Sequence, residues 1–320
     1  MKVSVIIAAY NAEEDIGNCI DSVLNQSHGD FELIIVDDAS SDNTLDIIKQ
    51  YSKRDQRIKF FSNKINRRQG YSRNKAIKHA QGEVIAIIDS DCVANKNWLK
   101  NLLNGLKKEN VVIGKSLSTQ ENIWAKEVYR QFQHWLTSKK INHYIKNIDT
   151  KNCVIKKYIF EKVGLFDPAI SPSEDTDLTI RIRRAGFKIK FLDDAVVKHR
   201  DPTRLASQFH WAKQRAFSHY LIAKKYHRKI PKHAKEGTMF FISLGLLTIS
   251  LTALLFNRPL GFIFLSIFTL CFLTSFSTAI KNLVKLIFKK QTVTQFILFL
   301  VRDLGFKYGH ILRILRSSSV

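Results

Sequence analysis

The sequence predicts an α/β fold in which a mixed, mainly parallel sheet is flanked by helices. Apolar, β-branched runs alternate with amphipathic stretches over residues 1–115, and such alternation is typical of parallel sheets. Polar side chains follow these runs directly, as Tyr10-Asn11, Asp37-Asp38 and Asp89-Ser90-Asp91. The carboxyl ends of parallel strands are where such sheets collect functional residues. A chain of 320 residues that is 45% hydrophobic can also bury a substantial core.

The first half of this sheet follows from four predicted strands, at Val3–Ala9, Phe31–Val36, Ile58–Phe61 and Val84–Ile88. Between the first two strands, apolar residues recur at helical spacing and provide one face that can lie on the sheet. They are Ala12, Ile16, Cys19, Ile20, Val23 and Leu24. A further helix begins near Gly70 and ends at Gly82, where a left-handed cap would turn the chain into the fourth strand.

The pattern from Val111 to Arg200 is mixed. It predicts helices over Ile123–Trp135 and Asp175–Ala185, and a strand at Lys188–Leu192. We expect this half to complete a single catalytic domain over residues 1–200 and to shape the pocket of a second substrate.

The chain after residue 200 predicts attachment to a membrane. A basic and aromatic connector (201–237) precedes two uncharged stretches, Thr238–Phe256 and Leu260–Ile280, each long enough to cross a ~30 Å hydrocarbon core. They predict a transmembrane hairpin over 238–280, and basic flanks place the catalytic domain in the cytoplasm. The alternative is two core helices of a soluble protein. The tail, 281–320, predicts a basic amphipathic helix at the interface, with a cell-membrane, multi-pass localisation.

The net charge of +23 suits nucleic acid, an anionic membrane or phosphorylated substrates. The basic membrane flanks explain much of this charge, so membrane lipid, and no nucleic acid, is the expected partner. The four cysteines have no paired spacing, which favours reduced thiols over a disulfide framework or a zinc site.

Five motifs, taken in order, resemble the signature of family 2 glycosyltransferases, which have the GT-A fold of nucleotide-diphospho-sugar transferases. They are Ser4 through Asn11, Val36 through Thr44, Gly70 through Ala76, Asp89-Ser90-Asp91, and Glu174-Asp175 leading into Leu178 and Arg181. The resemblance covers roughly Lys2 to Arg200. It implies transfer of a sugar from a UDP- or GDP-linked donor to an acceptor hydroxyl.

The Asp89-Ser90-Asp91 motif suits a hard divalent cation, Mg²⁺ or Mn²⁺, because carboxylates and phosphate oxygens together can hold such an ion. Taken alone, the motif could equally be a solvated turn. The resemblance implies that Asp91 is a metal ligand and that Asp89 lies nearer the sugar and ribose. His199 resembles a family histidine that would reach the metal or the diphosphate, although a lone histidine more often makes a local hydrogen bond.

The donor nucleotide is expected to lie at the ends of the first two strands. The resemblance implies nucleoside recognition by Asp38 and a donor-binding segment at Ala8, Tyr10 and Asn11, with the Tyr10 ring beside the base. Asp38 could instead cap the following helix. Arg73 is the predicted contact to the base edge or the diphosphate, or else part of a solvated cationic face.

The acids Glu174-Asp175 open a predicted helix, where acids also favour the helix dipole. On the family pattern, Asp175 removes the proton of the acceptor hydroxyl, with inversion at the anomeric carbon, and Glu174 orients the acceptor. Asn152 resembles part of the acceptor side. The processive synthases of this family carry a Q-x-x-R-W motif. Here Gln208-Phe209-His210-Trp211 matches only part of it, so transfer of one sugar is expected.

The expected acceptor is a lipid-linked saccharide or a cell-surface glycan precursor, and a polyprenyl-phosphate glycosyl synthase is the first alternative. A sugar nucleotidyltransferase is disfavoured because no Gly-rich phosphate loop follows the first strand. A non-catalytic membrane module is disfavoured because all the acidic motifs are present.

Overall fold

A computed structural model describes residues 2–137, 141–227, 246–247, 258–275, 297–298 and 300–309. Two compact units are found, residues 1–121 with 128–201, and residues 122–127 with 202–320. The first unit contains the sheet, and the second contains α8 (Leu205–Lys225) and α10 (Arg258–Ser275). Helix α5 (Ile123–Thr137) begins in the second unit and continues in the first.

Nine strands of the described chain form one mixed sheet, in the order β3-β2-β1-β4-β8-β6-β9-β5, with β7 pairing to β9. The strands are β1 (Val3–Ala9), β2 (Phe31–Asp37), β3 (Ile58–Ser62), β4 (Val84–Ile88), β5 (Cys92–Ala94), β6 (Val111–Ser118), β7 (Tyr144–Ile145), β8 (Asn152–Lys156) and β9 (Ile189–His199). The first four run parallel to one another. Strand β8 is antiparallel to both β4 and β6. The predicted mixed sheet is therefore confirmed, although only its first four strands form the mainly parallel part that was expected.

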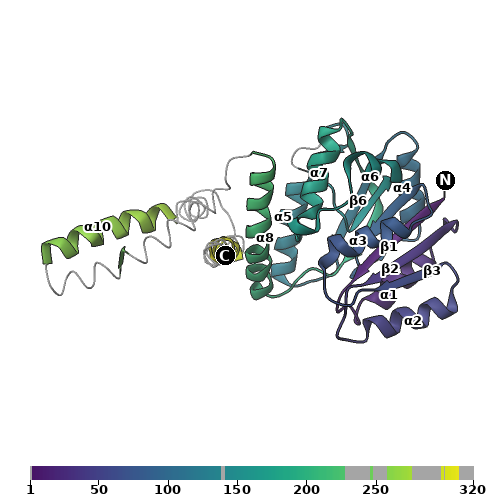
Figure 1. The fold of residues 1–320 in the computed structure, drawn as a ribbon, viewed down its shortest axis with the longest axis horizontal. Helices are drawn as coiled ribbons and strands as arrows, with labels where there is room; N and C mark the ends of the chain where they lie inside the picture. Colours follow the sequence, from purple (N-terminus) through teal and green to yellow (C-terminus); the bar gives the residue numbers. More distant parts are fainter. Residues whose placement is uncertain are drawn as a thin grey trace. The chain divides into compact units, whose positions relative to one another are not determined.

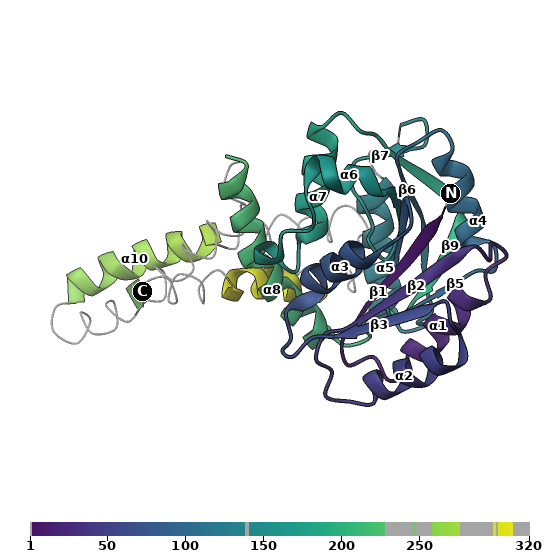
Figure 2. The same ribbon diagram turned by 45° about the vertical axis from the view of Figure 1, so that its right-hand side comes forward.

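Helices cover both faces of the sheet (Figures 1 and 2). They are α1 (Ile16–Leu24), α2 (Thr44–Arg54), α3 (Arg68–His79), α4 (Trp98–Leu106), α6 (Lys157–Val163) and α7 (Glu174–Arg184), with a 3-10 turn at Pro168–Ile170. One core cluster joins α1, α2 and α4 to one face, and a second joins α3, α6 and α7 to the other. Because strand side chains alternate, neighbours such as Val5 and Ile6 enter different clusters.

A β-bulge divides the pairing of β6 with β9 into two parts. Ile113 pairs with Phe191, and after the register shift Lys115 pairs with Val196. A Cβ on Gly114 would lie 2.0 Å from the Ala195 carbonyl oxygen, so only glycine fits at this close approach. The strand predicted at Lys188–Leu192 is longer in the structure, where β9 runs from Ile189 to His199. The end of β9 pairs with β5, where His199 lies opposite Cys92.

The predicted transmembrane hairpin is wrong for the part of the chain that is described, where no helix is both long and apolar enough to cross a bilayer. Helix α10 has 18 residues, about 27 Å at 1.5 Å per residue, and begins with Arg258 and Pro259. Its apolar part is thus shorter than a ~30 Å core. The first predicted span, Thr238–Phe256, lies outside the described residues except for 246 and 247. The predicted membrane localisation stays a prediction.

The tail also differs from its predicted amphipathic pattern over residues 300–309. Lys307 and Asp303 are buried and form an ion pair of 2.6 Å, whereas Leu304 and Tyr308 are exposed. The reason is a close approach to α8: a Cβ on Gly305 would lie 2.5 Å from the Phe209 carbonyl oxygen. Gly309, four residues later, approaches the Lys213 carbonyl oxygen in the same way. These two glycines, and not apolar periodicity, decide which face of this helix is buried. The rest of the predicted tail lies outside the described residues.

Candidate active site

The polar segments that follow β1, β2 and β4 meet at one edge of the sheet, because these strands are parallel neighbours. The first two segments are joined by hydrogen bonds. The Asn11 amide N–H donates to Ser40 Oγ (3.0 Å), the Ser41 N–H donates to Asn11 Oδ1 (2.8 Å), and the Ala12 N–H donates to Thr44 Oγ1 (2.7 Å). Asn11 has a positive φ of 47°, which asparagine tolerates better than most residues. These contacts hold the two loops as a single platform.

Asp38 and Tyr10 are the two predicted nucleoside contacts, and both lie on this platform. Asp38 is buried, and its Oδ1 accepts hydrogen bonds from Asn63 Nδ2 (2.7 Å) and from the Arg67 N–H (3.0 Å). The Tyr10 side chain is 50% exposed, so its ring can receive a planar ligand. Ala8, in β1, is half-buried. Asp38 thus also fixes the loop between β3 and α3.

Arg73, on α3, is fully buried and joins two acids from distant segments. Its Nη2 lies 2.6 Å from Asp89 Oδ1, and its Nη1 lies 2.9 Å from Glu174 Oε1. Burial by itself would lower the pKa of Arg73, but the two acids outweigh this and the net pKa is raised. The guanidinium is covered, and the predicted contact of Arg73 to the base or the diphosphate stays a prediction.

Glu174 is fully buried at the start of α7, and its Oε1 also accepts a hydrogen bond from Gln69 Nε2 (2.7 Å). A Cβ on Gly70 would lie 3.2 Å from the Glu174 side chain, so the glycine leaves room for this acid. Burial raises the pKa of Glu174, against the attraction of Arg73. Glu174 is thus held between Arg73 and Gln69, and its predicted role in orienting the acceptor stays a prediction.

Asp175, the next residue, is only half-buried. Its Oδ1 accepts a hydrogen bond from the Thr176 N–H (2.6 Å), and its negative charge helps to raise the pKa of Arg73. Asp175 therefore belongs to the same cluster as Asp89, although the two residues come from α7 and from the end of β4. The predicted base and the predicted donor-side acid share one site.

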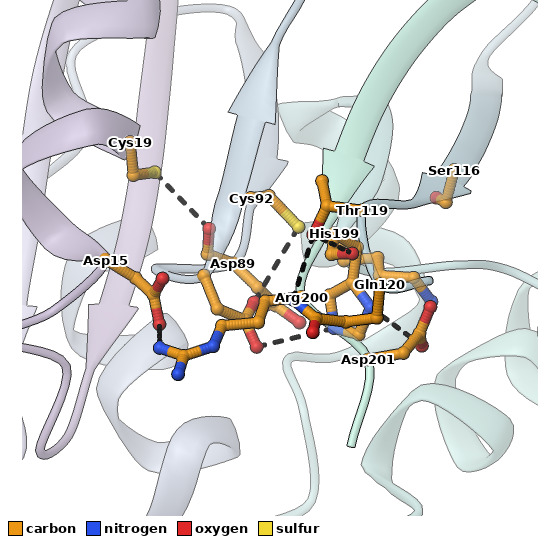
Figure 3. Close-up of polar contacts among 12 residues, drawn as sticks. Asp15, Cys19, Asp89, Cys92, Ser116, Thr119, Gln120, His199, Arg200 and Asp201 are labelled. Carbon is orange, nitrogen blue, oxygen red and sulfur yellow. Dashed lines mark hydrogen bonds and ion pairs between the residues drawn. The ribbon is translucent and has the colours of Figure 1, made fainter. Parts of the chain in front are cut away.

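Asp91 and His199 form a second group of contacts at this site, and Figure 3 shows His199 near Asp89 and Asp201. His199 Nε2 lies 3.3 Å from Asp91 Oδ2, and His199 Nδ1 lies 3.0 Å from Asp201 Oδ1. Burial lowers the pKa of the imidazole, but its hydrogen bonds to Asp201 and Asp91 outweigh this and raise it to about 10. Burial raises the pKa of Asp91, but the His199 contact, helped by the charge of Lys151, outweighs this, and the net pKa is lowered.

These residues fit a divalent cation by their chemistry. The partly exposed carboxylate of Asp91 lies next to His199 Nε2, and Asp201 holds His199 Nδ1. Metal-binding histidines are commonly oriented by such a contact on their other ring nitrogen. Asp89 is one-third exposed beside them. No group of three or more His, Cys, Asp or Glu residues in the described chain has the arrangement of a complete metal site, so phosphate oxygens and water would have to complete the coordination.

Asn152, the predicted acceptor-side residue, is fully buried at the start of β8. Its Oδ1 accepts a hydrogen bond from Trp98 Nε1 (2.8 Å), and its Nδ2 donates to the carbonyl oxygens of Lys115 and Ala195 (both 3.0 Å). Asn152 thus bridges the β6–β9 bulge from inside the sheet. Its side chain is occupied with packing in this structure.

Three further charged residues lie at the site without having been predicted. Arg200 forms ion pairs with Glu14 and with Asp15 (3.1 Å), and its N–H donates to the Asp91 carbonyl oxygen (3.2 Å). Asp201 orients His199, and Lys151 lies beside the acids at the end of β4. The signal available for Arg200 and Asp201 was their position directly after His199. For Lys151, it was the position before Asn152.

The model of the family described as glycosyl transferase family 2 matches residues 4–164. A Bacillus subtilis protein named for teichuronic acid biosynthesis, the glycosyltransferase TuaG, is 31% identical over 65% of this chain and 82% of its own length. The Escherichia coli UDP-Glc:alpha-D-GlcNAc-diphosphoundecaprenol beta-1,3-glucosyltransferase WfgD is 39% identical over 34% of this chain and 42% of its own length.

Among solved structures, the fold is similar to that of mannosyltransferase PcManGT from Pyrobaculum calidifontis, in complex with GDP-Man and Mn²⁺. The TM-score is 0.64 at 16% identity, covering 98% of this chain and 86% of that one. At this identity the likeness concerns the fold, and it supports the predicted GT-A type of sheet.

Proposed function

This chain belongs to glycosyl transferase family 2 and is a glycosyltransferase, and from that premise we propose that it transfers one sugar from a nucleotide diphosphate sugar to an acceptor hydroxyl with inversion. The observation that carries the proposal is the pair of ion pairs made by Arg73. They hold Asp89, at the end of β4, and Glu174, at the start of α7, in one cluster. Donor-side and acceptor-side acids can therefore act on the same substrate pair.

Asp175 is the proposed general base. Its carboxylate is partly open to solvent, whereas that of Glu174 is fully covered, so only Asp175 can reach an acceptor hydroxyl. It takes the proton as the hydroxyl oxygen attacks the anomeric carbon from the face opposite the leaving diphosphate. Glu174, held by Arg73 and Gln69, fixes the first turn of α7 and so positions Asp175.

We propose that Asp91 and His199, with Asp89 beside them, hold Mg²⁺ or Mn²⁺, which neutralises negative charge on the leaving diphosphate. Asp201 keeps the His199 ring oriented through Nδ1. Ion binding would displace the proton that His199 carries when its pKa is near 10. Support from outside this chain is that PcManGT was solved with Mn²⁺.

The donor is proposed to be UDP- or GDP-linked, and the acceptor to be a lipid-linked saccharide or a glycan precursor. WfgD is named for transfer from UDP-Glc to a diphosphoundecaprenol-linked sugar, and PcManGT was solved with GDP-Man. The exposed Tyr10 ring and the buried Asp38 supply one stacking surface and one acidic edge for the base. A uracil or a guanine ring suits both.

The test begins with purified protein in Mn²⁺ or Mg²⁺, screened for thermal stabilisation by UDP, GDP and their sugars. Asp175→Asn should then lower turnover of the identified donor by a factor of about 10² or more and leave nucleoside diphosphate affinity within twofold of wild type. Asp194→Asn, on the exposed side of β9, is the matched control. Unchanged turnover in Asp175→Asn contradicts the proposed base.

A further inference from the structure

Lys151 occupies the position directly opposite the first acid of the Asp89-Ser90-Asp91 segment. Strand β8 runs antiparallel to β4, and the last pair in that register is Ile88 with Asn152. Lys151 and Asp89 are the next residues beyond this pair, and the charge of Asp89 helps to raise the pKa of Lys151. Side chains that face each other on neighbouring antiparallel strands have Cβ atoms about 5 Å apart. The fold therefore puts an ammonium group next to the acids of the donor site.

The Lys151 ammonium is fixed in place from two sides. Its Nζ lies 2.9 Å from Asp149 Oδ1, and Asp149 Oδ2 accepts a hydrogen bond from Ser116 Oγ (2.8 Å) on β6. The Nζ also lies 3.8 Å from the centroid of the Phe132 ring. An ammonium has three hydrogens to donate, and Asp149 is its single hydrogen-bond partner within the described residues. Two donors are left for a ligand or for water.

The charge of Lys151 acts on the proposed donor and metal residues. Burial lowers the pKa of Lys151, but the Asp149 contact outweighs this and the net pKa is raised, so the side chain is a cation at neutral pH. The same charge helps His199 to lower the pKa of Asp91 and opposes the rise in the pKa of His199. Lys151 therefore shares a local field with Asp89, Asp91 and His199.

The other cations at the site already have acidic partners, and Arg200 is paired with Glu14 and Asp15. Arg73 is covered and contacts two acids, and His199 lies between two carboxylates. The Lys151 side chain is 15% exposed and contacts one acid. Of these, Lys151 is the cation with donors that an anionic ligand entering at Asp89 can reach.

We propose that Lys151 binds the diphosphate oxygens of the sugar nucleotide and supplies a fixed positive charge to the leaving group in addition to the metal. The inference rests on the proposed function, since it assumes a diphosphate at Asp89 and Asp91. A lysine ammonium is a compact point charge that suits phosphate oxygens without a fixed angular geometry. Asp149 and Ser116 act as the support that keeps it in place.

The proposal separates two parts of nucleotide affinity, one from the metal and one from Lys151. In wild-type protein, we expect nucleoside diphosphate binding to weaken in EDTA but to persist, because the ammonium remains. In Lys151→Met, binding in EDTA should fall by a further factor of about ten or more, the size expected for a lost charge-assisted hydrogen bond. Binding of the nucleoside monophosphate should stay within twofold, because its single phosphate lies nearer the base.

The experiment is isothermal titration with UDP and UMP, or with GDP and GMP, according to which base the donor screen selects. Lys151→Arg should retain most of the diphosphate affinity, since it keeps the charge. Lys156→Met is the matched control. It lies in the same strand, paired with Val84 at the opposite end of β4, and should bind both nucleotides as wild type does.

Equal diphosphate affinity in Lys151→Met and wild type, in EDTA, overturns the proposal and leaves the proposed function intact. If Lys151→Met loses affinity equally for the monophosphate and the diphosphate and also melts at a lower temperature, the proposal is overturned, because Lys151 then serves only to stabilise the fold. Lys151→Arg repeats the comparison in a variant that keeps the positive charge beside Asp149. Failure of the wild type to bind any of the four nucleotides, with or without Mn²⁺, removes the proposed function and this inference together.

Discussion

The two sides of the site are built differently. On the nucleoside side, the loops after β1 and β2 are joined by hydrogen bonds between residues about thirty positions apart, such as Asn11 and Ser40 (29 positions). On the charged side, ion pairs connect segments much further apart in sequence, such as Arg73 and Glu174 (101 positions). The first side rests on hydrogen bonds near the start of the chain, some exposed and some buried, with no ion pair among those described above. The second side rests on buried charges that only the finished sheet brings together.

This difference predicts how each side responds to the loss of one partner. An exposed or neutral hydrogen bond contributes about 1 kcal/mol, so its loss should be local. Removal of one partner of a buried ion pair leaves an uncompensated charge and costs about 3–5 kcal/mol. The charged side should therefore control the stability of the whole first unit as well as its chemistry.

The largest effect is expected for Arg73→Met, because Glu174 then remains fully buried without its cation. We expect the free energy of unfolding to fall by about 3–5 kcal/mol, measured by urea denaturation at pH 7. Glu174→Gln should cost less than Arg73→Met, because it removes the charge and keeps a group that can accept a hydrogen bond from Gln69.

The double variant Arg73→Met/Glu174→Gln completes a thermodynamic cycle. It should be more stable than the sum of the two single losses implies, since neither charge is left alone. Strict additivity of the two losses would show that the ion pair is not the source of the effect and would remove the contrast between the two sides.

The second effect concerns pH. The pKa of His199 is about 10 in this structure and about 6.5 in an unfolded chain. Its contribution to stability is thus fully present below about pH 6.5 and is lost as pH rises toward 10. In EDTA, wild type should exceed His199→Gln by about 2–4 kcal/mol at pH 6, and the gap should close by pH 10.

Denaturation at a series of pH values between 6 and 10 measures this gap. This range avoids the low pH values at which Asp91, whose pKa is lowered, would take up a proton and lose its own contribution to stability. Asp201→Asn should reduce the gap without abolishing it, because Asp91 still contacts the ring. A gap that is the same at pH 6 and pH 10 would contradict the proposed charge state of His199.

A smaller effect is expected on the nucleoside side, for Thr44→Val. Thr44 is fully buried, and its Oγ1 accepts the hydrogen bond of the Ala12 N–H (2.7 Å) and donates to Asp42 Oδ1 (2.6 Å). Valine has the same shape but leaves the buried N–H unpaired, at a cost of about 1–2 kcal/mol. Ser52→Ala is the control, because this half-buried residue of α2 makes only a local hydrogen bond to the Lys49 carbonyl oxygen. A loss as large as that of Arg73→Met would erase the difference between the two sides.

The same contrast explains what the sequence could predict. Strands β1 to β4 and the acids at their ends are read from apolar runs followed by polar residues, which are local patterns. Strands β6 and β8 were not predicted, because their mixed composition does not alternate and their register depends on the bulge at Gly114. The pairing of Arg73 with Glu174 was likewise beyond reach, since no local pattern shows which distant acid a buried arginine meets.

Tertiary packing supplies contacts that local patterns do not show. Asn152 resembles an acceptor-side residue in sequence, which stays a prediction, and its amide also closes a gap inside the sheet. Lys307 lies on the basic face of the predicted tail helix, yet Gly305 and Gly309 bring that helix so near to α8 that Lys307 is buried with Asp303. In both cases the deciding contact comes from a segment that periodicity does not include.

The smallest effect is expected for Asn11, where the hydrogen bond and the backbone can be measured separately. Asn11→Gly loses the exposed contact to the Ser41 N–H but keeps a residue that adopts φ 47° freely, so it should cost about 0.5 kcal/mol. Asn11→Ala loses the same contact and must also adopt the left-handed conformation, which adds about 1 kcal/mol. Denaturation of both variants gives the backbone cost as their difference. If the alanine variant is as stable as the glycine variant, the loop relaxes without strain, and the platform is held by the Ser40 and Thr44 contacts alone.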